Sequence, residues 1–504
     1  MKLLFLFVAL FMAHLAVFVT ADLDLVLLHT NDMHSRFDET DIYCNECRKN
    51  DAVNGRCYGG FARVAQVVKD EKKKAEEKNL TSLFIVAGDT FQGTPYFTFF
   101  KWQAVVDFIK QLQPDVMNLG NHEFDDGIDS LVSYLNGIQD IPTVVSNLNM
   151  TLEPDLDKFI TRSFVFEKNN TKVGIVGYLT TDTPVNNGSF TIFIKLIYLG
   201  KPPSIEKPYG TYPLYVTTVK NKTVPILQIY ANTKYIGKVD IHFNSNGDLV
   251  SINGSPILLN NEIKQDPSML TVIDKWKPSV TKITNVTVGR TTVELLNNCH
   301  LMECNIGNLI ADSFVYYNVL KKKNYDEYWT DAPIGIVLSG SIRNTINEND
   351  HEGYITLGQL INVSPFANKL VKVTISGASL LEAFEHSVFD YLLHNGGINF
   401  LQVSGVLVEF DLSQKPGHRV SSLYLRCGDC SVPKFDPVIL TANYTLVTSD
   451  YLANGGNNFN AFKKIVKKNE ILSVVDYNAT AMYMESISPI TIGIENRIII
   501  KTSN

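Results

Sequence analysis

Short apolar runs alternate with amphipathic stretches through the first half of the chain. Residues 23–28 predict a buried strand, and residues 61–78 repeat apolar positions with the period of a helix whose outer face is charged. The same pattern predicts a helix at 101–112 and strands at 83–86, 116–119, 143–146 and 173–178. Because strands and helices alternate, we expect a layered α/β domain.

A second unit follows a long helical stretch, as a length of 504 residues allows. Residues 266–282 have helical periodicity with little glycine, and we expect them to connect two domains. Beyond them the pattern predicts a helix at 379–391 and strands at 334–338, 370–375, 406–411 and 444–448. The expected organisation is a leader at 1–21, a first domain at 22–265, a connecting helix and linker at 266–290 and a second domain at 291–504.

The start of the chain predicts export from the cell. Its first residues hold one lysine and a long apolar run that ends in Val19-Thr20-Ala21, which is typical of a signal peptide cleaved before Asp22. The alternative is a membrane anchor, but the run is short and no basic flank follows it. The C-terminus has no hydrophobic tail of the kind that a GPI signal requires. We therefore expect a secreted protein without a membrane anchor.

The charge balance gives no indication of a nucleic-acid partner. The net charge is −7, and the lysine run at 72–74 is followed by Glu76 and Glu77, which is typical of the solvated face of a helix. We expect no nucleic acid to bind.

Glycosylation signals and cysteines fit the secreted compartment. Ten Asn-X-Ser/Thr sequons are present, at Asn79, Asn149, Asn169, Asn187, Asn221, Asn253, Asn285, Asn362, Asn443 and Asn478. The seven cysteines predict local disulfides Cys299–Cys304 and Cys427–Cys430, with Cys57 paired to either Cys44 or Cys47 and one thiol left over. A zinc site at the three N-terminal cysteines is the alternative, but no histidine or fourth cysteine lies nearby in the sequence.

Three polar motifs follow predicted strands, where sheets of this kind place their ligands. They are Thr30-Asn31-Asp32-Met33-His34, Ala87-Gly88-Asp89 and Gly120-Asn121-His122-Glu123. A carboxylate such as Asp89 can bridge two divalent ions that clamp a phosphoryl group and activate a water. His122 is then free to act on the departing oxygen, with Asp125 fixing its tautomer. A strand-end Asp is more often a helix cap and a buried His more often a core residue, but the three motifs in this order are specific.

The motifs and their order resemble the 5′-nucleotidase/apyrase family over nearly all of the mature chain. The resemblance implies a four-layer αββα metallophosphoesterase-like domain, here shortened, and a C-terminal α/β nucleotide-binding domain. It implies metal ligation by Asp32, His34, Asp89 and Asn121, and catalysis by His122 with Asp125. It also implies nucleotide contacts from Arg36, Arg343 and Asn457, and a base held between the rings of Phe366 and Tyr451.

Parts of the family pattern are missing. The family completes its metal site from two loops, Gly-His-Ser and Gly-Gly-His-Ser-Asn/His-Thr, and neither occurs in this chain, which is considerably shorter between residues 179 and 197. His242 is the next histidine along the chain, but it lies in an alternating, strand-like stretch at a position that matches no ligand. In the second domain Leu338 replaces a polar base contact, His300 replaces an arginine, and Asn457 replaces the ribose-binding aspartate.

These losses favour a binding protein over an enzyme. We expect at most one divalent ion, whether Zn, Mg, Mn or Ca, since only Asp89 and Asn121 remain for a second. Free members of the family resemble the apyrases that blood-feeding arthropods secrete in saliva, so the expected role is antihaemostatic inhibition of platelet aggregation through binding of ATP, ADP, AMP or a host platelet surface receptor. The alternative is a metal-dependent hydrolase of those nucleotides at one metal.

Overall fold

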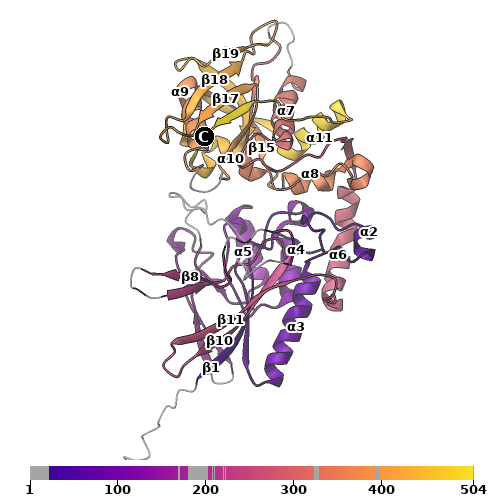
Figure 1. Cartoon of the computed structure of the whole chain (residues 1–504), viewed down its shortest axis with the longest axis vertical. Coiled ribbons are helices and arrows are strands. Elements are labelled where there is room, and N and C mark those ends of the chain that lie inside the picture. The colour runs from indigo at the N-terminus through magenta and orange to yellow at the C-terminus, as the bar shows by residue number, and fades with distance from the viewer. Residues whose placement is uncertain are drawn as a thin grey trace, which may run out of the picture.

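The computed structural model describes residues 22–168, 171–179, 203–206, 208, 210–218, 221, 223–322, 328–391 and 397–502. They form two lobes, and helix α6 (Pro267–Thr284) lies along the first lobe and reaches the second (Figure 1). The expected leader, the stretch at 180–202 and the sequons Asn169 and Asn187 lie outside the described residues.

A seven-stranded sheet forms the centre of the first lobe, in the order β11-β10-β1-β2-β3-β4-β5. Its strands are β1 (Leu23–Thr30), β2 (Thr81–Val86), β3 (Val116–Met117), β4 (Thr143–Val144), β5 (Ile160–Thr161), β10 (Tyr235–Phe243) and β11 (Leu249–Leu258). The first five run parallel, and β10 pairs antiparallel with β1. The carboxyl ends of β1, β2 and β3 therefore meet at one edge of the sheet, as the sequence predicts.

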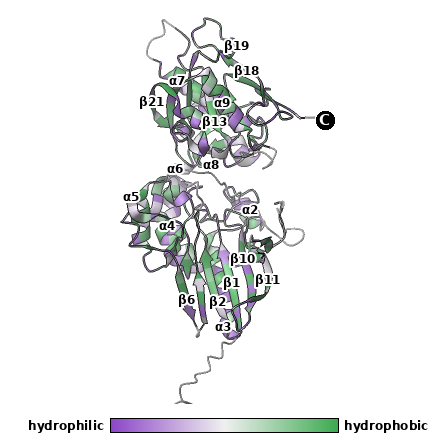
Figure 2. Ribbon diagram, turned by 90° about the vertical axis from the view of Figure 1, so that its left-hand side faces the viewer, coloured by the Kyte–Doolittle hydropathy of each residue, from purple (hydrophilic) through white to green (hydrophobic). Residues whose placement is uncertain are grey.

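Helices cover one face of this sheet and bury the larger core of the lobe. They are α3 (Phe61–Glu77), α4 (Pro95–Leu112) and α5 (Ile128–Gly137), together with α6. Leu28, Phe84 and Val86 of the sheet pack against Phe61, Phe108 and other apolar side chains of the helices. The central strands are accordingly mostly green in the hydropathy view (Figure 2).

Helix α4 begins six residues before the predicted start because it is built in two parts. Lys101 has φ 50° and ψ −144° inside the helix and breaks it there. The apolar pattern predicts only the part that follows this break, whereas Pro95 opens the first part at a position where a helix tolerates proline.

Two hairpins cover the other face of the sheet. They pair β6 (Phe164–Lys168) with β7 (Thr171–Ile175) and β8 (Leu214–Thr217) with β9 (Thr223–Ile226). Their inward side chains join a second core around Leu25, Tyr235 and Val239. The strand expected at 173–178 thus belongs to a hairpin and not to the parallel sheet. Within the described residues the second β layer consists of these hairpins.

The second lobe is also α/β. A five-stranded sheet has the order β16-β13-β20-β15-β21, and a four-stranded sheet has the order β19-β18-β17-β22. The strands are β13 (Ile334–Leu338), β15 (Lys369–Ser376), β16 (Leu401–Ser404), β17 (Val406–Asp411), β18 (Val420–Arg426), β19 (Phe435–Pro437), β20 (Asn443–Ser449), β21 (Ile465–Val475) and β22 (Ile498–Lys501). The helices are α7 (Asn305–Leu320), α8 (Leu357–Val363), α9 (Gly377–Ser387), α10 (Asp450–Ala453) and α11 (Asp476–Ile487). Every element that we predict in this half is present, with small shifts at its ends.

The first part of α4 joins the two lobes. Phe99 packs against the core of the second lobe, which α7, α8 and α11 share. The hydroxyl of Thr98 donates a hydrogen bond to the carbonyl of Pro365 at 3.4 Å. Phe100, one residue further, packs on Trp276 of α6 at 5.1 Å between ring centroids. One short stretch of α4 therefore touches both the second lobe and the helix that leads to it.

No helix of the described residues is both long and apolar enough to cross a membrane. Seven of the eight sequon asparagines that the structure describes are exposed, and Asn362 on α8 is half-buried with its Oδ1 lacking a hydrogen-bond partner. Among the sequons that the structure describes, Asn362 is therefore the least suited to a glycan.

The structure pairs Cys47 with Cys57 and leaves Cys44 as a buried thiol, alongside Cys299–Cys304 and Cys427–Cys430. The Cys47–Cys57 bond removes two of the thiols that a zinc site would need. We expect peptide mapping under non-reducing conditions to recover a Cys47–Cys57 crosslink, and Cys44 to react with an alkylating reagent only after unfolding because it is buried. A Cys44–Cys57 crosslink would contradict this pairing.

Candidate metal and nucleotide site

Two loops at the carboxyl ends of β1 and β2 are joined through their backbones. The N–H of Asp32 donates to Gly88 O at 3.2 Å, that of His34 to Asp89 O at 2.9 Å, and that of Ser35 to Thr90 O at 3.0 Å. This pairing brings the first two sequence motifs together and fixes the direction of their side chains.

The same loops hold strained backbone. Asp32, His34, Ser35, Asp89 and Gln92 all have φ between 48° and 62°, a region that non-glycine residues rarely adopt. Each such residue costs about 1–3 kcal/mol and persists only where its surroundings enforce it, which happens most often at functional sites.

Three side chains from the three motifs converge. The ligand atoms of His34, Asp89 and His122 lie within 4.8 Å of one another. His34 is 4% exposed, and its Nε2 has no hydrogen-bond partner although it lies 4.0 Å from Asp32 Oδ1. A buried imidazole nitrogen without a partner, beside carboxylates, fits a metal ligand. The donor set of imidazole and carboxylate therefore fits a divalent ion.

The charges at this point favour a cation. Burial and the neighbouring His122 lower the pKa of His34 to about 3, so its imidazole is neutral and able to coordinate. Burial and the adjacent Asp89 carboxylate raise the pKa of Asp32. Two carboxylates this close repel each other, and a divalent ion between them would offset that repulsion.

His122 begins the short 3₁₀ helix η1 (His122–Phe124) and is held on two sides. Its N–H donates to Asp89 Oδ1 at 3.0 Å, and its Nδ1 lies 2.7 Å from Asp125 Oδ2. Burial alone would lower the pKa of His122, but the carboxylates of Asp125 and Asp89 outweigh burial and raise the pKa to about 9. The predicted His122–Asp125 pair is therefore present in the structure.

Glu123 has a role that the sequence analysis did not assign. It is 1% exposed, and its carboxylate accepts the N–H groups of Asp89, Thr90, Phe91 and Gly120 at 2.6–3.1 Å and the hydroxyl of Thr90 at 2.8 Å. One buried carboxylate thus joins the loop after β2, which carries Asp89, to the turn at Gly120 that precedes His122. Its position directly after His122 was a visible signal, since a carboxylate buried at a loop must collect N–H donors.

Arg36 and Asn121 adjoin the converging group through His34 and His122. Arg36 is buried, and its Nη1 donates to the carbonyls of His34 and Gly93 while its Nε has no partner. Its hydrogen bonds to these carbonyls stabilise the loop after β1. Its contact with phosphate stays a prediction. Asn121 lies at the N-terminus of η1, half-exposed, and its side chain makes no cap hydrogen bond.

Two residues of the second lobe reach this site. The ring of Phe366 packs on that of His122, with 5.7 Å between centroids, and the guanidinium of Arg343 lies 5.8 Å from the Phe366 ring. Arg343 also interacts electrostatically with Asp89, Asp32 and Asp125. The predicted nucleotide residues Phe366 and Arg343 of the second lobe therefore face the predicted metal ligands of the first lobe, across the joint between the two lobes.

Tyr451 lies in a separate polar network. Its side chain is largely accessible, with 46% of the residue exposed, and its hydroxyl donates to Asn457 Oδ1 at 2.6 Å. Asn457 Nδ2 donates in turn to Asn399 Oδ1 at 2.9 Å. Among the described residues no ring contact joins Tyr451 to Phe366, so a base held between the two rings stays a prediction.

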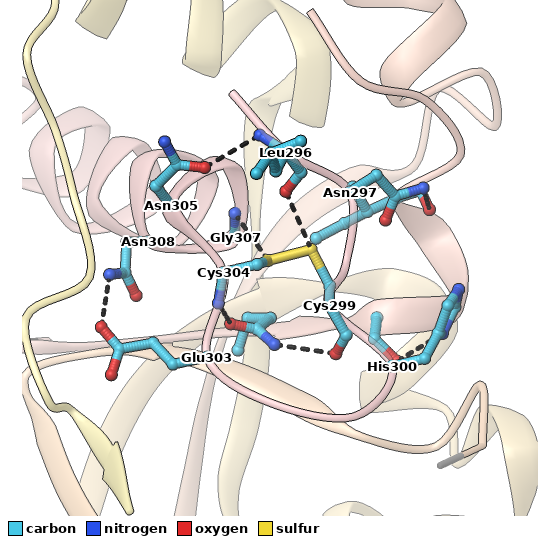
Figure 3. The surroundings of a disulfide bond; sticks show 12 residues. Leu296, Asn297, Cys299, His300, Glu303, Cys304, Asn305, Gly307 and Asn308 are labelled. Atoms are coloured by element: carbon cyan, nitrogen blue, oxygen red, sulfur yellow. Dashed lines mark hydrogen bonds between the residues drawn. A yellow bond between two sulfur atoms is a disulfide. The ribbon is translucent and has the colours of Figure 1, made fainter. Parts of the chain in front are cut away.

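The loop of the Cys299–Cys304 disulfide holds His300, which stands where the resemblance implies an arginine. Gln402 fastens the loop by donating to Cys299 O at 2.9 Å and accepting from Cys304 N–H at 3.1 Å. His300 lies in the same loop as the disulfide (Figure 3), and its Nδ1 lies 3.2 Å from Ser339 Oγ. Burial and the nearby Arg343 lower the pKa of His300 to about 4. His300 is therefore neutral near neutral pH and does not supply the charge of an arginine.

One described range of the chain ends at Leu179, beside the ends of β3 and β4. Asn147 donates to Leu179 O at 2.7 Å and accepts from Leu179 N–H at 2.9 Å, and Asn118 donates to Tyr178 O at 2.9 Å. The stretch at 180–202, where the family pattern is shortened, lies outside the described residues. His242 pairs with Asp24 near the opposite end of β1, at 2.8 Å, so it does not belong to the site.

Each of the two lobes matches a known protein family. Residues 25–196 match the calcineurin-like phosphoesterase profile, and residues 283–464 match the profile of the 5′-nucleotidase C-terminal domain. The chain is 36% identical to Protein 5NUC of Lutzomyia longipalpis, over 94% of this chain and 92% of that protein. It is 32% identical to an apyrase of Tabanus yao, over 94% and 93%, and 33% identical to the human 5′-nucleotidase, over 95% and 92%.

A solved structure and the alignment lengths add two facts. The structure of the Thermus thermophilus 5′-nucleotidase precursor superposes with a TM-score of 0.80 at 25% identity, covering 95% of this chain and 99% of that one. The alignment with the Lutzomyia longipalpis protein runs over 536 positions but uses 94% of this 504-residue chain, so that relative carries residues at about 60 positions without a counterpart here. With both of its lobes matched and its relatives covered nearly end to end, the chain belongs to the 5′-nucleotidase family.

Proposed function

We propose that this protein binds a nucleotide at the joint between its lobes, with at most one divalent ion, and acts by binding more than by turnover. The proposed role is antihaemostatic: a secreted, glycosylated protein that inhibits platelet aggregation by holding ATP, ADP or AMP. Names such as apyrase and 5′-nucleotidase among its relatives support a nucleotide as the ligand. A platelet surface receptor is the second candidate partner.

The observation that carries the proposal is the asymmetry of the ligand set. One ion would have His34 and Asp89, which converge, together with Asp32 beside them, whereas a second ion would have only Asp89 and Asn121 among the described residues. Membership of this family implies dependence on a divalent metal. Two ligands, one of them shared, are too few for a tightly held second ion. The positions that this chain lacks relative to its family also support an incomplete site.

The residues of the second lobe favour ligand binding. Arg343 carries a positive charge to the joint, where it can attract a phosphate, and Phe366 presents a ring there. Stacking of a base on such a ring contributes about 1–3 kcal/mol and does not depend on catalysis. Relative to the family pattern that the sequence resembles, His300, Leu338 and Asn457 stand in place of other polar contacts, whereas Phe366 and Tyr451 match the two aromatic positions.

The alternative function is a metal-dependent nucleotide phosphohydrolase, and the His122–Asp125 pair favours it. A bound divalent ion would polarise a phosphate and activate a water. His122, held by Asp125 at 2.7 Å, would keep a proton ready for the departing oxygen. Asp32, His34 and Asp89 would hold the ion.

Phosphate release and metal content together test the proposal. We expect little release of phosphate from ATP, ADP or AMP, with or without EDTA, and at most one tightly held ion per chain by elemental analysis after dialysis. His34→Ala should lose that ion because it removes the unpartnered Nε2. His418→Ala is the matched control, because His418 is exposed in the other lobe. Two ions per chain with EDTA-sensitive phosphate release would contradict the proposal and establish the enzyme.

A further inference from the structure

Asn31, the residue before Asp32, is buried, and its amide is held in one orientation. It is 8% exposed. Its Oδ1 accepts the N–H of Ile229 at 3.1 Å, and its Nδ2 donates to Ile229 O at 3.0 Å and to Asp32 Oδ2 at 2.7 Å. A flipped amide would place its oxygen against two acceptors and its NH₂ group against a donor, so the neighbouring groups fix this orientation.

The backbone that holds this amide is itself fixed. Ile229 begins a segment between β9 and β10 that lies along the loop after β1. The N–H of Asn232 donates to Asp32 O at 2.8 Å. The hydroxyl of Thr233 donates to Arg36 O at 3.0 Å. The segment therefore contacts the metal-site loop at both of its ends and holds the amide in a defined place between the two chains.

The two carboxylate oxygens of Asp32 consequently face different partners. Oδ2 accepts the amide N–H of Asn31, whereas Oδ1 lies 4.0 Å from His34 Nε2, which is buried and has no hydrogen-bond partner. A divalent ion with ligand bonds of about 2.0–2.2 Å can bind two atoms at this separation. Oδ1 is therefore the oxygen of Asp32 that faces the imidazole nitrogen available to an ion.

We propose that Asn31 is a positioning residue for the divalent ion, because it holds Oδ2 of Asp32 and thereby directs Oδ1 toward His34. This inference rests on the metal site of the proposed function. Asn31 touches neither the ion nor the nucleotide in this proposal, since it acts through Asp32. Without the amide, the carboxylate can rotate about its Cβ–Cγ bond, and binding of an ion must then also restrict that rotation.

Co²⁺ is the probe for this site, because its visible absorption reports the geometry of its ligands. Asn31→Leu keeps the size of the side chain but removes the amide. We expect this variant to bind Co²⁺ about 10–100-fold more weakly than the wild type in a titration followed by that absorption, since loss of a hydrogen-bond partner of a metal ligand typically costs this much affinity. The absorption spectrum of the bound ion should also change, which a loss of stability alone would not cause.

Asn305→Leu is the matched control, because Asn305 is a similarly buried asparagine that connects two segments of the second lobe in the same way. It is 9% exposed, its Nδ2 donates to Glu294 O at 2.7 Å, and its Oδ1 accepts the N–H of Leu296 at 2.9 Å. Both substitutions leave buried backbone groups without partners, so both should lower the midpoint of thermal unfolding. Of the two asparagines, only Asn31 contacts a carboxylate of the metal site, so Asn305→Leu should bind Co²⁺ as the wild type does.

His34→Ala separates this inference from the proposed function. If His34→Ala loses the ion while folded Asn31→Leu binds it with unchanged affinity, or if Asn305→Leu weakens binding equally, the inference is overturned and the proposed site stands. A wild type that binds no Co²⁺ overturns both. Two Co²⁺ ions per wild-type chain contradict the proposed function, and weaker binding of one of them in Asn31→Leu would still support the inference. If Asn31→Leu fails to fold, the smaller Asn31→Ala decides the question against Asn305→Ala, and an unchanged affinity overturns the inference.

Discussion

Glu123→Gln is expected to lower the free energy of unfolding by about 2–6 kcal/mol, because it leaves at least two buried N–H groups without an acceptor. In the native protein Oε2 accepts from Asp89 and Gly120, and Oε1 accepts from Thr90 and Phe91. In the glutamine one of these two oxygens is replaced by an amide NH₂ group. That group is itself a donor, so it cannot accept from the N–H groups that face it. Denaturant unfolding monitored by circular dichroism measures the loss.

The control for this substitution is Glu76→Gln on the exposed face of α3, which should change stability by less than about 0.5 kcal/mol. The Glu123 variant should also hold a divalent ion more weakly, because the loop with Asp89 loses its anchor to the turn that carries His122. Destabilisation of less than about 1 kcal/mol would show that other acceptors replace this carboxylate.

His122→Ala is expected to leave inhibition of platelet aggregation nearly unchanged, because under the proposed function His122 does no chemistry on the nucleotide. If the protein worked by hydrolysis, the same change would cost about 100-fold or more in turnover. The measurement is an aggregation dose–response with ADP and then with a non-hydrolysable agonist, with His418→Ala as control.

Variants of the ring residues identify the ligand in the same assay. Phe366→Ala or Tyr451→Ala should weaken inhibition only if the nucleotide itself is bound. Loss of inhibition in His122→Ala, together with no effect of the wild type on the non-hydrolysable agonist, would rule out the binding role and leave hydrolysis.

Local motifs predict which side chains meet at the carboxyl edge of the sheet, because each motif follows a strand. The ends of β1, β2 and β3 coincide with the sequence motifs, and the His122–Asp125 pair needs only one helical turn. Glu123 escaped assignment because most of its N–H donors, Asp89, Thr90 and Phe91, lie 32 to 34 positions away along the chain. Sequence distance hides such contacts.

The sequence also did not predict which strands and cysteines pair with each other. Residues 173–178 have the apolar pattern of a core strand, but β7 pairs with β6, since register depends on a partner and not on the strand alone. Spacing left Cys44 and Cys47 equivalent as partners of Cys57, and only the path of the chain distinguishes them. The contact of Phe366 with His122 depends on how the two lobes meet.

The divided helix α4 has a consequence for how the chain folds. Both of its parts contribute to the core of the first lobe, the first through Tyr96 and Phe97, whereas half-buried Phe99 of the first part packs against the core of the second lobe. A first lobe formed alone would leave Phe99 more exposed to water, and a second lobe formed alone would lack this contact with its core. Folding cooperativity thus extends through α4, and the lobe that is synthesised first reaches its final packing only when the C-terminal half of the chain has been added.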